Sequence, residues 1–315
     1  MLTVNITTQS PAMNEVSSVS VCFLGCGNLG SAILSGLLVS SNNASKETQR
    51  FSRFIATVRS QSSVTRLQEQ FCDYTDKLSV FQNDNIRAVS ESDVIILATD
   101  PTDVESVLTE PGLCDQLSQK LLISVAAGWT RQKLEGVLYG EGHSINAENR
   151  AWVIRTLPNV AAVVHAGLTV IETPHPDLPP GHMDTTKSIF DCVGKTMVLQ
   201  PHLLDAATAV GGSTPAFFAV ICEAFIDASV AVGVPRDIAH GSIAQSMLGT
   251  ARMLLSGMQP SAVKDKGTSP EGCTMSGLMI LEETAVRGHV GRALREAVTV
   301  ARSMGTVEHV NDTRH

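Results

Sequence analysis

The sequence predicts an α/β domain with a doubly wound parallel sheet, followed by an all-helical domain. From Ser18 to about Val198, short β-branched runs alternate with capped or amphipathic segments, as βαβ units require when helices cover both faces of a sheet. After Pro201 the β pattern gives way to helical periodicity. A chain of 315 residues has room for two domains, which we expect at residues 18–200 and 201–315, after a disordered leader at residues 1–17.

Eight runs rich in Val, Ile and Leu are the candidate strands, with ends expected to be correct within a few residues. They are Val19–Leu24, Phe54–Val58, Leu78–Phe81, Val94–Ala98, Leu121–Val125, Trp152–Thr156, Leu168–Ile171 and Thr196–Val198. Two segments between them are predicted to be surface loops: the polar Ser40–Arg50 and the proline-rich Thr173–Gly181.

In the helical half, prolines are expected to start helices and glycines to stop them. The starts are Pro215, Pro235 and Pro260, and the stops are Gly233, Gly257 and Gly305. The segment Pro215–Val232 is apolar on nearly every face, which a surface helix of one small domain cannot bury alone. We therefore expect a homodimer interface there, with a central helix of a monomeric bundle as the alternative.

Composition excludes several classes of partner. The 31 acidic and 23 basic side chains give a net charge of −8, which opposes binding to nucleic acid or to an anionic membrane surface. The most apolar stretch, Ala216–Val234, carries Glu223 and Asp227, so no membrane span is expected. Seven cysteines without metal-ligand spacing favour reduced, mostly buried thiols and no metal site. Residues 1–17 lack the features of a signal peptide, so a cytosolic location is expected.

A glycine-rich motif lies where the first predicted strand meets a helix. The strand runs directly into Gly25-Cys26-Gly27-Asn28-Leu29-Gly30, and a helical stretch, Ser31–Leu38, follows. Gly25 permits a tight turn, Gly27 lets the backbone approach a pyrophosphate, and Gly30 lets the helix pack closely. The helix N-terminus also offers N–H groups to the anion. The motif therefore predicts a Rossmann-like dinucleotide site that includes Asn28 and Leu29, and a glycine-rich turn without a ligand is the alternative.

The end of the second predicted strand favours NADPH over NADH. Phe54–Val58 is followed by Arg59-Ser60-Gln61-Ser62-Ser63, which lacks the carboxylate that would bind the ribose 2′-hydroxyl of NAD. A guanidinium group flanked by hydroxyls suits the 2′-phosphate of NADP, because Arg pairs with phosphate in a bidentate manner. We predict that Arg59 and Ser60 bind this phosphate, and a solvated surface charge is the alternative for Arg59.

Two further strand ends are expected beside the motif, because ligands of open α/β sheets bind beyond the carboxyl ends of strands. They are Ala98-Thr99-Asp100-Pro101 and Val125-Ala126-Ala127-Gly128. Small residues there would let ribose and nicotinamide approach the backbone, while ordinary turn chemistry is the alternative. The candidate cofactor contacts are Thr99, Pro101, Ala126, Ala127 and Gly128.

A hydroxyl-rich helix start interrupts the helical half. Thr268-Ser269-Pro270-Glu271-Gly272-Cys273-Thr274 precedes the apolar-periodic run Met275–Leu281. Free N–H groups at such a start, with the hydroxyls of Ser269 and Thr274, are suited to bind a substrate carboxylate. The alternative is an N-cap. His165 and His240 lie at no motif and are expected to be structural.

With these residues the chain resembles the Δ1-pyrroline-5-carboxylate reductase family, from about Val19 to Gly305. The matching segments are GCGNLG, DVIILATDP, SVAAG, Leu157-Pro158-Asn159, Gly212–Phe217 and, as the most specific, KDKGTSPEGCTMSGLMILEE at Lys264–Glu283. The resemblance implies a Rossmann domain followed by a helical dimerisation domain, with dimers that can assemble further. It also implies reduction of a cyclic imine, 1-pyrroline-5-carboxylate, to proline by NAD(P)H in the last step of proline biosynthesis.

The same resemblance places Ser269, Gly272, Cys273 and Thr274 on the loop that holds the substrate carboxylate and ring nitrogen, and Asn159 at the cofactor. Hydride passes from nicotinamide C4 to the imine carbon, and the ring nitrogen must be protonated. Thr274 is the candidate catalytic residue, because its hydroxyl would hydrogen-bond the ring nitrogen and help deliver the proton if the imine does not bind already protonated. Orientation of the two reacting carbons supplies most of the catalysis.

Three residues depart from the family pattern: Asp100 replaces a usual Lys, and Thr214 and Glu271 each replace a usual Gly. Glu271 pointing inward would repel the substrate carboxylate and alter specificity, whereas Glu271 pointing to solvent would not. Two alternatives to the proline enzyme therefore stay open. One is a paralogue that reduces a substituted pyrroline carboxylate, a piperideine carboxylate or another cyclic imine of specialised metabolism. The other is a non-catalytic regulator that binds NADPH.

Overall fold

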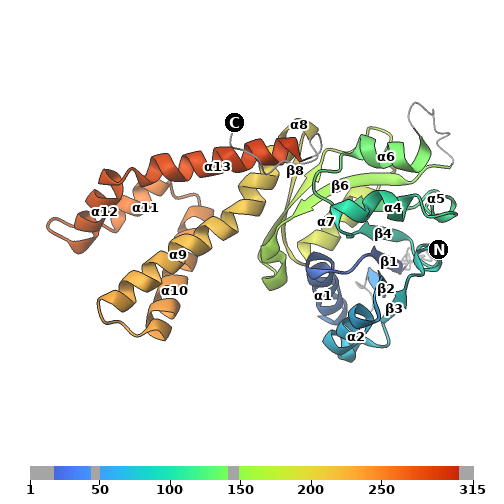
Figure 1. Ribbon diagram of the computed structural model, residues 1–315, viewed down its shortest axis with the longest axis horizontal. Helices are drawn as coiled ribbons and strands as arrows, with labels where there is room; N and C mark the ends of the chain where they lie inside the picture. The colour runs from blue at the N-terminus through green and yellow to red at the C-terminus, as the bar shows by residue number, and fades with distance from the viewer. Residues whose placement is uncertain (1–17, 44–49, 141–148, 305–315) are drawn as a thin grey trace, which may run out of the picture. The chain divides into compact units, whose positions relative to one another are not determined.

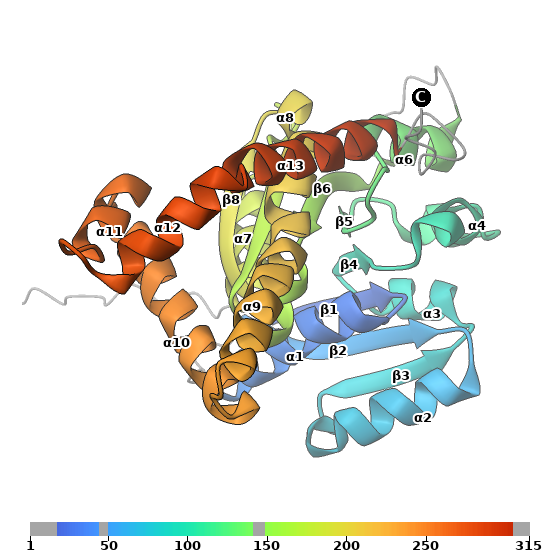
Figure 2. The ribbon, with the colours of Figure 1, turned by 60° about the vertical axis from the view of Figure 1, so that its left-hand side comes forward.

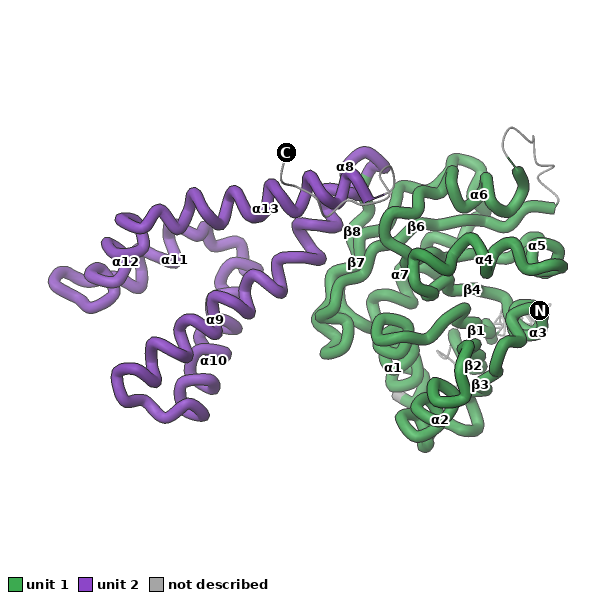
Figure 3. The backbone as a smooth tube through the Cα atoms, viewed as in Figure 1, with its two compact units in different colours: residues 1–199 green, residues 200–315 purple. Residues whose placement is uncertain are grey.

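A computed structural model describes residues 18–43, 50–140 and 149–304. The chain divides into two compact units, residues 1–199 and residues 200–315, called unit 1 and unit 2 below (Figure 3). The expected leader at residues 1–17 and the expected helix stop at Gly305 lie outside the described residues.

Unit 1 is built on an eight-stranded sheet with the order β3-β2-β1-β4-β5-β6-β7-β8 (Figures 1 and 2). The strands are β1 Val19–Leu24, β2 Phe51–Val58, β3 Leu78–Gln82, β4 Val94–Leu97, β5 Leu121–Ser124, β6 Trp152–Pro158, β7 Gly167–Glu172 and β8 Gly194–Leu199. All eight predicted strands are present. The pairs from β3 to β6 are parallel, β7 is antiparallel to β6, and β8 is parallel to β7. Because β2 and β4 flank β1, the winding reverses at β1, and the predicted fold class is confirmed.

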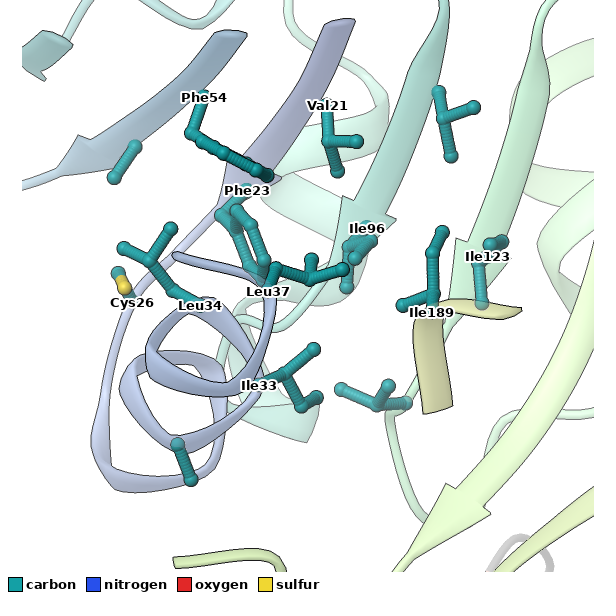
Figure 4. Close-up of a cluster of buried hydrophobic side chains, with 14 of the residues drawn as sticks. Val21, Phe23, Cys26, Ile33, Leu34, Leu37, Phe54, Ile96, Ile123 and Ile189 are labelled. Atoms are coloured by element: carbon teal, nitrogen blue, oxygen red, sulfur yellow. The ribbon is translucent and has the colours of Figure 1, made fainter. Parts of the chain in front are cut away.

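Helices cover both faces of this sheet. They are α1 Asn28–Asn43, α2 Gln61–Gln70, α3 Asn85–Ser90, α4 Val104–Leu108, α5 Leu113–Gln116, α6 Arg131–Tyr139 and α7 His182–Asp191, with short 3-10 turns η1 Cys72–Tyr74, η2 Pro101–Asp103 and η3 Val160–Val164. Side chains that alternate along β1 enter two separate cores. Phe23 packs with Leu37 of α1 and Ile189 of α7 (Figure 4), while Leu24 packs with residues of α3 to α6 on the other face.

Among its described residues 200–304, unit 2 consists of helices and the turns that join them. Its elements are α8 Pro201–Ala207, the π-helix η4 Thr208–Ser213, α9 Thr214–Ala231, α10 Arg236–Leu255, α11 Pro260–Lys266, α12 Cys273–Glu283 and α13 Val286–Ser303. Helices α9 and α10 lie side by side as a hairpin (Figure 1), and Arg236 at the start of α10 pairs with Asp227 near the end of α9 at 2.6 Å. This hairpin exposes most of its apolar side chains.

The exposure of α9 bears on how unit 2 is completed. None of its residues is buried in the single chain, and the side chains of Phe218 and Val220 are 53% and 66% exposed. The interior helix of a monomeric bundle would be buried, so that alternative is wrong. By length and composition, the joined helix Pro201–Ala231 is also apolar enough to cross a membrane. An uncovered apolar face of this kind requires either a protein partner or lipid.

Two helix ends differ from the sequence prediction. Helix α1 continues to Asn43, although Ser40 was expected to begin a loop. Lys77 explains the extension, because its Nζ donates to the Ser41 carbonyl oxygen and hydroxyl at 3.4 and 3.2 Å, where a cation stabilises a helix C-terminus. Pro215 lies in the first turn of α9, as predicted, but α8 and η4 precede this helix without a break. The wide π turn accommodates a proline that has no N–H to donate. The predicted loop at Thr173–Gly181 is confirmed.

The cysteines are less buried than the sequence predicts. All seven are free thiols, but only Cys22 and Cys26 are buried, and Cys72 and Cys273 are exposed. Burial raises the pKa of Cys26 to about 11 and raises the pKa of Cys22 further, so both thiols stay protonated at neutral pH. Among the described residues, no group of three or more His, Cys, Asp or Glu side chains could hold a metal ion.

Replacing Gly36 tests how tightly α1 packs in unit 1. A Cβ on Gly36 would lie 2.3 Å from Val193 Cγ1 and 3.0 Å from the Cys192 carbonyl oxygen, so Gly36→Ala is expected to lower the free energy of unfolding by about 1–3 kcal/mol. Gly136→Ala on α6 is the matched control, because a Cβ there meets nothing within 4 Å and should stabilise its helix by up to about 1 kcal/mol. Urea unfolding measures both, and equal effects would contradict the close packing.

Candidate active site

A cleft of about 660 Å³ opens at the carboxyl ends of β1, β2, β4 and β5. Residues 25–30, which follow β1, form one wall. The segments that follow β2, β4 and β5 contribute residues 57–60, 98–101 and 125–127, and Asp103 and Val107 lie beyond the β4 end. Ser63 and Arg66 of α2, with Asn83 and Asn85, complete the lining. The fold therefore brings together the glycine-rich motif and the three strand ends that the sequence analysis selected separately.

Most of the predicted cofactor contacts lie in this cleft. They are Gly25, Gly27, Asn28, Leu29, Gly30, Arg59, Ser60, Thr99, Pro101, Ala126 and Ala127. Gly128 and Asn159 do not line it. Gly128 has a φ of 77° in the turn before α6, and Asn159 Oδ1 accepts a hydrogen bond from the Leu168 N–H at 3.1 Å. The described contact of Asn159 therefore joins its turn to β7.

The three glycines of the motif have different surroundings. Gly25 has a φ of 80°, and a Cβ there would lie 2.8 Å from the Thr99 Cα, so the chain leaving β1 passes directly against the end of β4. A Cβ on Gly30 would lie 3.2 Å from the Gly25 carbonyl oxygen. In contrast, nothing lies within 4 Å of a Cβ on Gly27, which lines the open cleft. Gly25 and Gly30 are thus needed for packing, and Gly27 leaves space at the cleft wall.

Arg59 lies at the mouth of the cleft with an 80% exposed side chain. Its Nη1 is 3.0 Å from Asp103 Oδ1, and its carbonyl oxygen accepts from Gln82 Nε2 at 3.2 Å. Ser60 next to it is the N-cap of α2, because its hydroxyl accepts from the Ser63 N–H at 3.2 Å. The backbone of this corner is fixed, while the guanidinium group of Arg59 remains at the surface.

Arg66 and Asp103 are cleft residues that the sequence analysis missed. Arg66 donates from Nη2 to the Cys26 carbonyl oxygen at 2.7 Å and from Nη1 to Ser31 Oγ at 3.3 Å, so α2 is tied to the glycine-rich loop. Its only sequence signal is a cation between the apolar positions Val64 and Leu67 of a predicted helix. Asp103 gave no signal, because its partner Arg59 lies 44 residues earlier in the chain.

The cleft lining contains two carboxylates, Asp100 and Asp103, and two guanidinium groups, Arg59 and Arg66. Asp100 accepts hydrogen bonds from Thr102 Oγ1 at 2.7 Å and from the Thr102 N–H at 3.0 Å. These hydrogen bonds, and then the charge of Arg59, lower the pKa of Asp100, so this carboxyl group is ionised at neutral pH. The loop after β4 therefore presents two acidic side chains, Asp100 and Asp103, to the cleft.

Trp129 joins two of the cleft-lining loops. Its indole Nε1 donates to the Pro101 carbonyl oxygen at 2.8 Å, which links the segment after β5 to the segment after β4. Helix α6 begins immediately afterwards, with Thr130 as its N-cap accepting from the Lys133 N–H at 3.2 Å. The segment that contains Ala126 and Ala127 is therefore tied to the segment after β4.

In unit 2, the predicted substrate loop ends at the start of α12. Gly272 is the N-cap, and no side chain in the described part of the chain caps the helix, so Ser269 and Thr274 do not serve as caps. The Gly272 N–H donates to the Ser269 carbonyl oxygen at 3.1 Å, and a Cβ on Gly272 would lie only 2.5 Å from Ser269 Oγ. The side chains of Ser269, Cys273 and Thr274 are exposed. The loop thus presents two hydroxyls and an uncapped helix N-terminus together.

Two of the departures have a conformational explanation. Glu271 has a φ of 59°, in the left-handed region that favours glycine, and its side chain is exposed. Thr214 is helical, with a φ of −60°, and its hydroxyl donates to the Val210 carbonyl oxygen at 2.7 Å. A side chain at residue 214 therefore costs no backbone strain, whereas a side chain at residue 271 does.

Neither of the two histidines set aside from catalysis lines the cleft. His165 lies after η3, with Nδ1 at 3.2 Å from the Cys192 carbonyl oxygen, and His240 is an exposed residue of α10.

Two family models match the chain. Residues 201–304 match "Pyrroline-5-carboxylate reductase dimerisation", and residues 20–128 match "NADP oxidoreductase coenzyme F420-dependent". The first match spans the described part of unit 2, which contains the uncovered apolar helix α9. The second match spans the strands and turns that form the cleft.

Similar proteins match over nearly the whole chain. A pyrroline-5-carboxylate reductase of Lophium arboricola is 41% identical over 95% of this chain and 98% of its own, and one of Schizosaccharomyces pombe is 33% identical over 90% and 98%. Among solved structures, Plasmodium falciparum pyrroline carboxylate reductase with NADP bound has a TM-score of 0.73 at 26% identity, covering 91% of this chain and 98% of that one. The enzyme from Coxiella burnetii has a TM-score of 0.75 at 26% identity, covering 92% and 100%.

The contrast between Gly25 and Gly27 gives a test of the cleft. Gly27→Ala is expected to leave the melting temperature unchanged and to weaken NADPH binding about tenfold or more, because the added methyl group would occupy the space left for a pyrophosphate. Gly25→Ala is expected to lower both the melting temperature and the affinity for NADPH, because its Cβ overlaps Thr99. Thermal unfolding and fluorescence titration with NADPH measure the two effects. Undiminished NADPH binding by Gly27→Ala would contradict the role of this wall.

Proposed function

The chain belongs to the pyrroline-5-carboxylate reductase family, and we propose that it reduces 1-pyrroline-5-carboxylate to proline with NADPH held in the cleft of unit 1. One observation carries the proposal: a dinucleotide-type cleft and a helical region of the dimerisation type occur in one chain that aligns with a named reductase over 95% of its length. The reaction is an oxidoreduction at a C=N bond. We assign residues 18–200 to cofactor binding and residues 201–315 to dimerisation and substrate binding.

The residues of the cleft fit NADPH. Gly27 leaves an open wall for a pyrophosphate, and the N-terminus of the 16-residue helix α1 begins at Asn28 beside it. Arg59, whose side chain is 80% exposed, would bind the 2′-phosphate, since a guanidinium group binds phosphate in a bidentate manner. When bound, the nicotinamide supplies the hydride. Thr99, Ala126 and Ala127 are small enough to let its ring and ribose approach the backbone, as we propose for these residues.

The loop before α12 is the proposed substrate site. The uncapped N–H groups at the start of α12 and the hydroxyl of Ser269 would bind the substrate carboxylate. Gly272 leaves room for the Ser269 hydroxyl in its present position, because a Cβ at residue 272 would lie 2.5 Å from Ser269 Oγ. Thr274 Oγ1 would accept or donate a hydrogen bond at the ring nitrogen and so help to place a proton there as the imine becomes an amine. Cys273, beside it, would contact the ring.

The other hypotheses gain no support from the comparisons. Relatives that align with 90% or more of this chain bear the name pyrroline-5-carboxylate reductase, so a paralogue for a different imine is not favoured. The exposed side chain of Glu271 agrees with the solvent-facing alternative. A substrate loop blocked by a side-chain cap would favour a non-catalytic NADPH-binding regulator, and none of the described side chains caps the start of α12.

Unit 2 is a dimerisation domain, and the chain forms a homodimer through it. We propose that the partner subunit, rather than lipid, covers the exposed apolar side chains of α9. Assembly beyond the dimer, a cytosolic location, and the lack of any nucleic-acid or membrane partner are also proposals. Seven free thiols support a reducing compartment, and the net charge of −8 supports the lack of nucleic-acid binding.

The activity itself is tested with purified protein, 1-pyrroline-5-carboxylate, and NADPH or NADH, by following cofactor absorbance and identifying proline by mass spectrometry. Turnover with proline formed supports the proposal. Binding of NADPH without turnover on any cyclic imine would indicate the regulator. Turnover restricted to other imines would indicate the paralogue.

Thr274→Val removes the hydroxyl but keeps the shape of the side chain. We expect kcat to fall about tenfold to a hundredfold, with a smaller rise in KM for the imine, because proton placement contributes to the chemical step. Ser276→Ala is the control, since it removes an exposed hydroxyl from the same helix outside the loop. Steady-state kinetics distinguish the two variants. A kcat of Thr274→Val within twofold of the parent value would remove Thr274 from catalysis.

Glu271→Gly tests whether Glu271 affects only the backbone strain of its loop or also the activity on the substrate. Relief of the left-handed conformation is expected to raise the free energy of unfolding by about 1 kcal/mol. Because the side chain is exposed, kcat/KM for 1-pyrroline-5-carboxylate should stay within about twofold. Urea unfolding and steady-state assays measure these quantities. A large rise in kcat/KM would instead show that Glu271 opposes the substrate carboxylate.

A further inference from the structure

An ion pair crosses the mouth of the cleft from one side of β1 to the other. Arg59 follows β2, and Asp103 belongs to the segment after β4, the two strands that flank β1 in the sheet. Their Nη1 and Oδ1 atoms are 3.0 Å apart, and both residues line the cleft. The guanidinium group that would bind the cofactor 2′-phosphate is therefore already paired with a carboxylate of the same chain.

The carboxylate of Asp103 is not needed to form its own helix. Asp103 is the N-cap of α4, but its side chain makes no capping hydrogen bond. The hydroxyl of Ser106 donates to the backbone carbonyl oxygen of Asp103, not to the carboxylate. Within the described part of the chain, Arg59 is thus the partner of this side chain.

Arg59 is also the cleft guanidinium that can turn toward a ligand. Arg66, the other one, is held by the Cys26 carbonyl oxygen and by Ser31 Oγ. The Arg59 side chain is 80% exposed, whereas the Asp103 side chain is 25% exposed, so the arginine can leave the pair more readily than the aspartate. Asp100, in the same loop as Asp103, adds a second negative charge near Arg59.

We propose that Asp103 determines how strongly this enzyme prefers NADPH to NADH. Its carboxylate competes with the 2′-phosphate for the Arg59 guanidinium. The 2′-phosphate of NADPH must compete with Asp103, because this carboxylate occupies Nη1 and offsets the charge of the guanidinium group, whereas NADH, which has no 2′-phosphate, leaves the pair intact. Asp103 therefore lowers the preference for NADPH over NADH that Arg59 alone would provide. A prediction made from the residues after β2 alone overstates this preference. This inference rests on the proposed cofactor cleft.

The test is Asp103→Asn, which removes the charge and keeps the shape. Calorimetric titration with 2′,5′-ADP and with 5′-AMP measures the 2′-phosphate contribution without any catalysis. We expect Asp103→Asn to bind 2′,5′-ADP about fivefold more tightly and 5′-AMP unchanged, as the loss of one exposed ion pair predicts. The ratio of kcat/KM for NADPH to that for NADH should rise by the same factor.

Glu91→Gln is the matched control. It removes one carboxylate from unit 1 and breaks ion pairs with Arg53 and Arg87, but Glu91 does not line the cleft. It should leave both affinities unchanged. In an Arg59→Gln background, Asp103→Asn should lose its effect, because the competition acts through Arg59.

The inference is overturned if Asp103→Asn leaves the 2′,5′-ADP affinity unchanged or weakens it, if 5′-AMP gains equally, or if the gain persists without Arg59. Failure of the parent protein to bind 2′,5′-ADP at all would overturn the cofactor cleft as well. Binding by the parent protein with no response to Asp103→Asn would overturn this inference alone.

Discussion

The close approach of the chain leaving β1 to the end of β4 is the constraint on which the cleft depends. A Cβ on Gly25 would lie 2.8 Å from the Thr99 Cα, so these two strand ends meet backbone to backbone. The contact places the N-terminus of α1 at the reversal point of the sheet, where strands diverge to both sides and leave a crevice. The loops that carry Arg59, Pro101 and Ala126 follow from that arrangement, because each continues a strand whose register is set by β1 or its neighbours.

The strands of the sheet could be predicted from the sequence because their side chains pack into two hydrophobic cores, one on each face of the sheet. Alternate residues of β1, such as Phe23 and Leu24, enter opposite hydrophobic clusters, so the strand reads as a continuous apolar run bounded by turns. The ends of helices were less predictable. The C-terminus of α1 is stabilised by Lys77, which is distant in sequence, and no local pattern reveals such a contact. The same holds for the residues of the cleft. The motif at Gly25–Gly30 is contiguous in sequence and could be predicted, whereas Asp103 is recognised only through its contact with Arg59, which is distant in sequence.

The proposed substrate loop and the apolar helix α9 both belong to unit 2. Unit 2 has few buried residues within the single chain, so its helices have too little core to be stable alone. Helix α12, at whose N-terminus we propose the substrate loop, belongs to the same dimerisation region as α9. If this loop binds the substrate as proposed, dilution that dissociates the dimer is expected to remove activity before it unfolds unit 1.

Three residues depart from the family pattern: Thr214 and Glu271 each replace a glycine, and Asp100 replaces a lysine. Their physical effects differ. Thr214 is helical, and its hydroxyl is satisfied within α9, so it changes little. Glu271 has a backbone conformation that glycine adopts freely, so its side chain adds backbone strain to the folded loop. Asp100 is different, because its ionised carboxylate faces the cofactor cleft beside Asp103. The loop before α12 therefore keeps a backbone conformation of the glycine type, and the change in electrostatics is concentrated at the cleft of unit 1, where we propose that the cofactor binds.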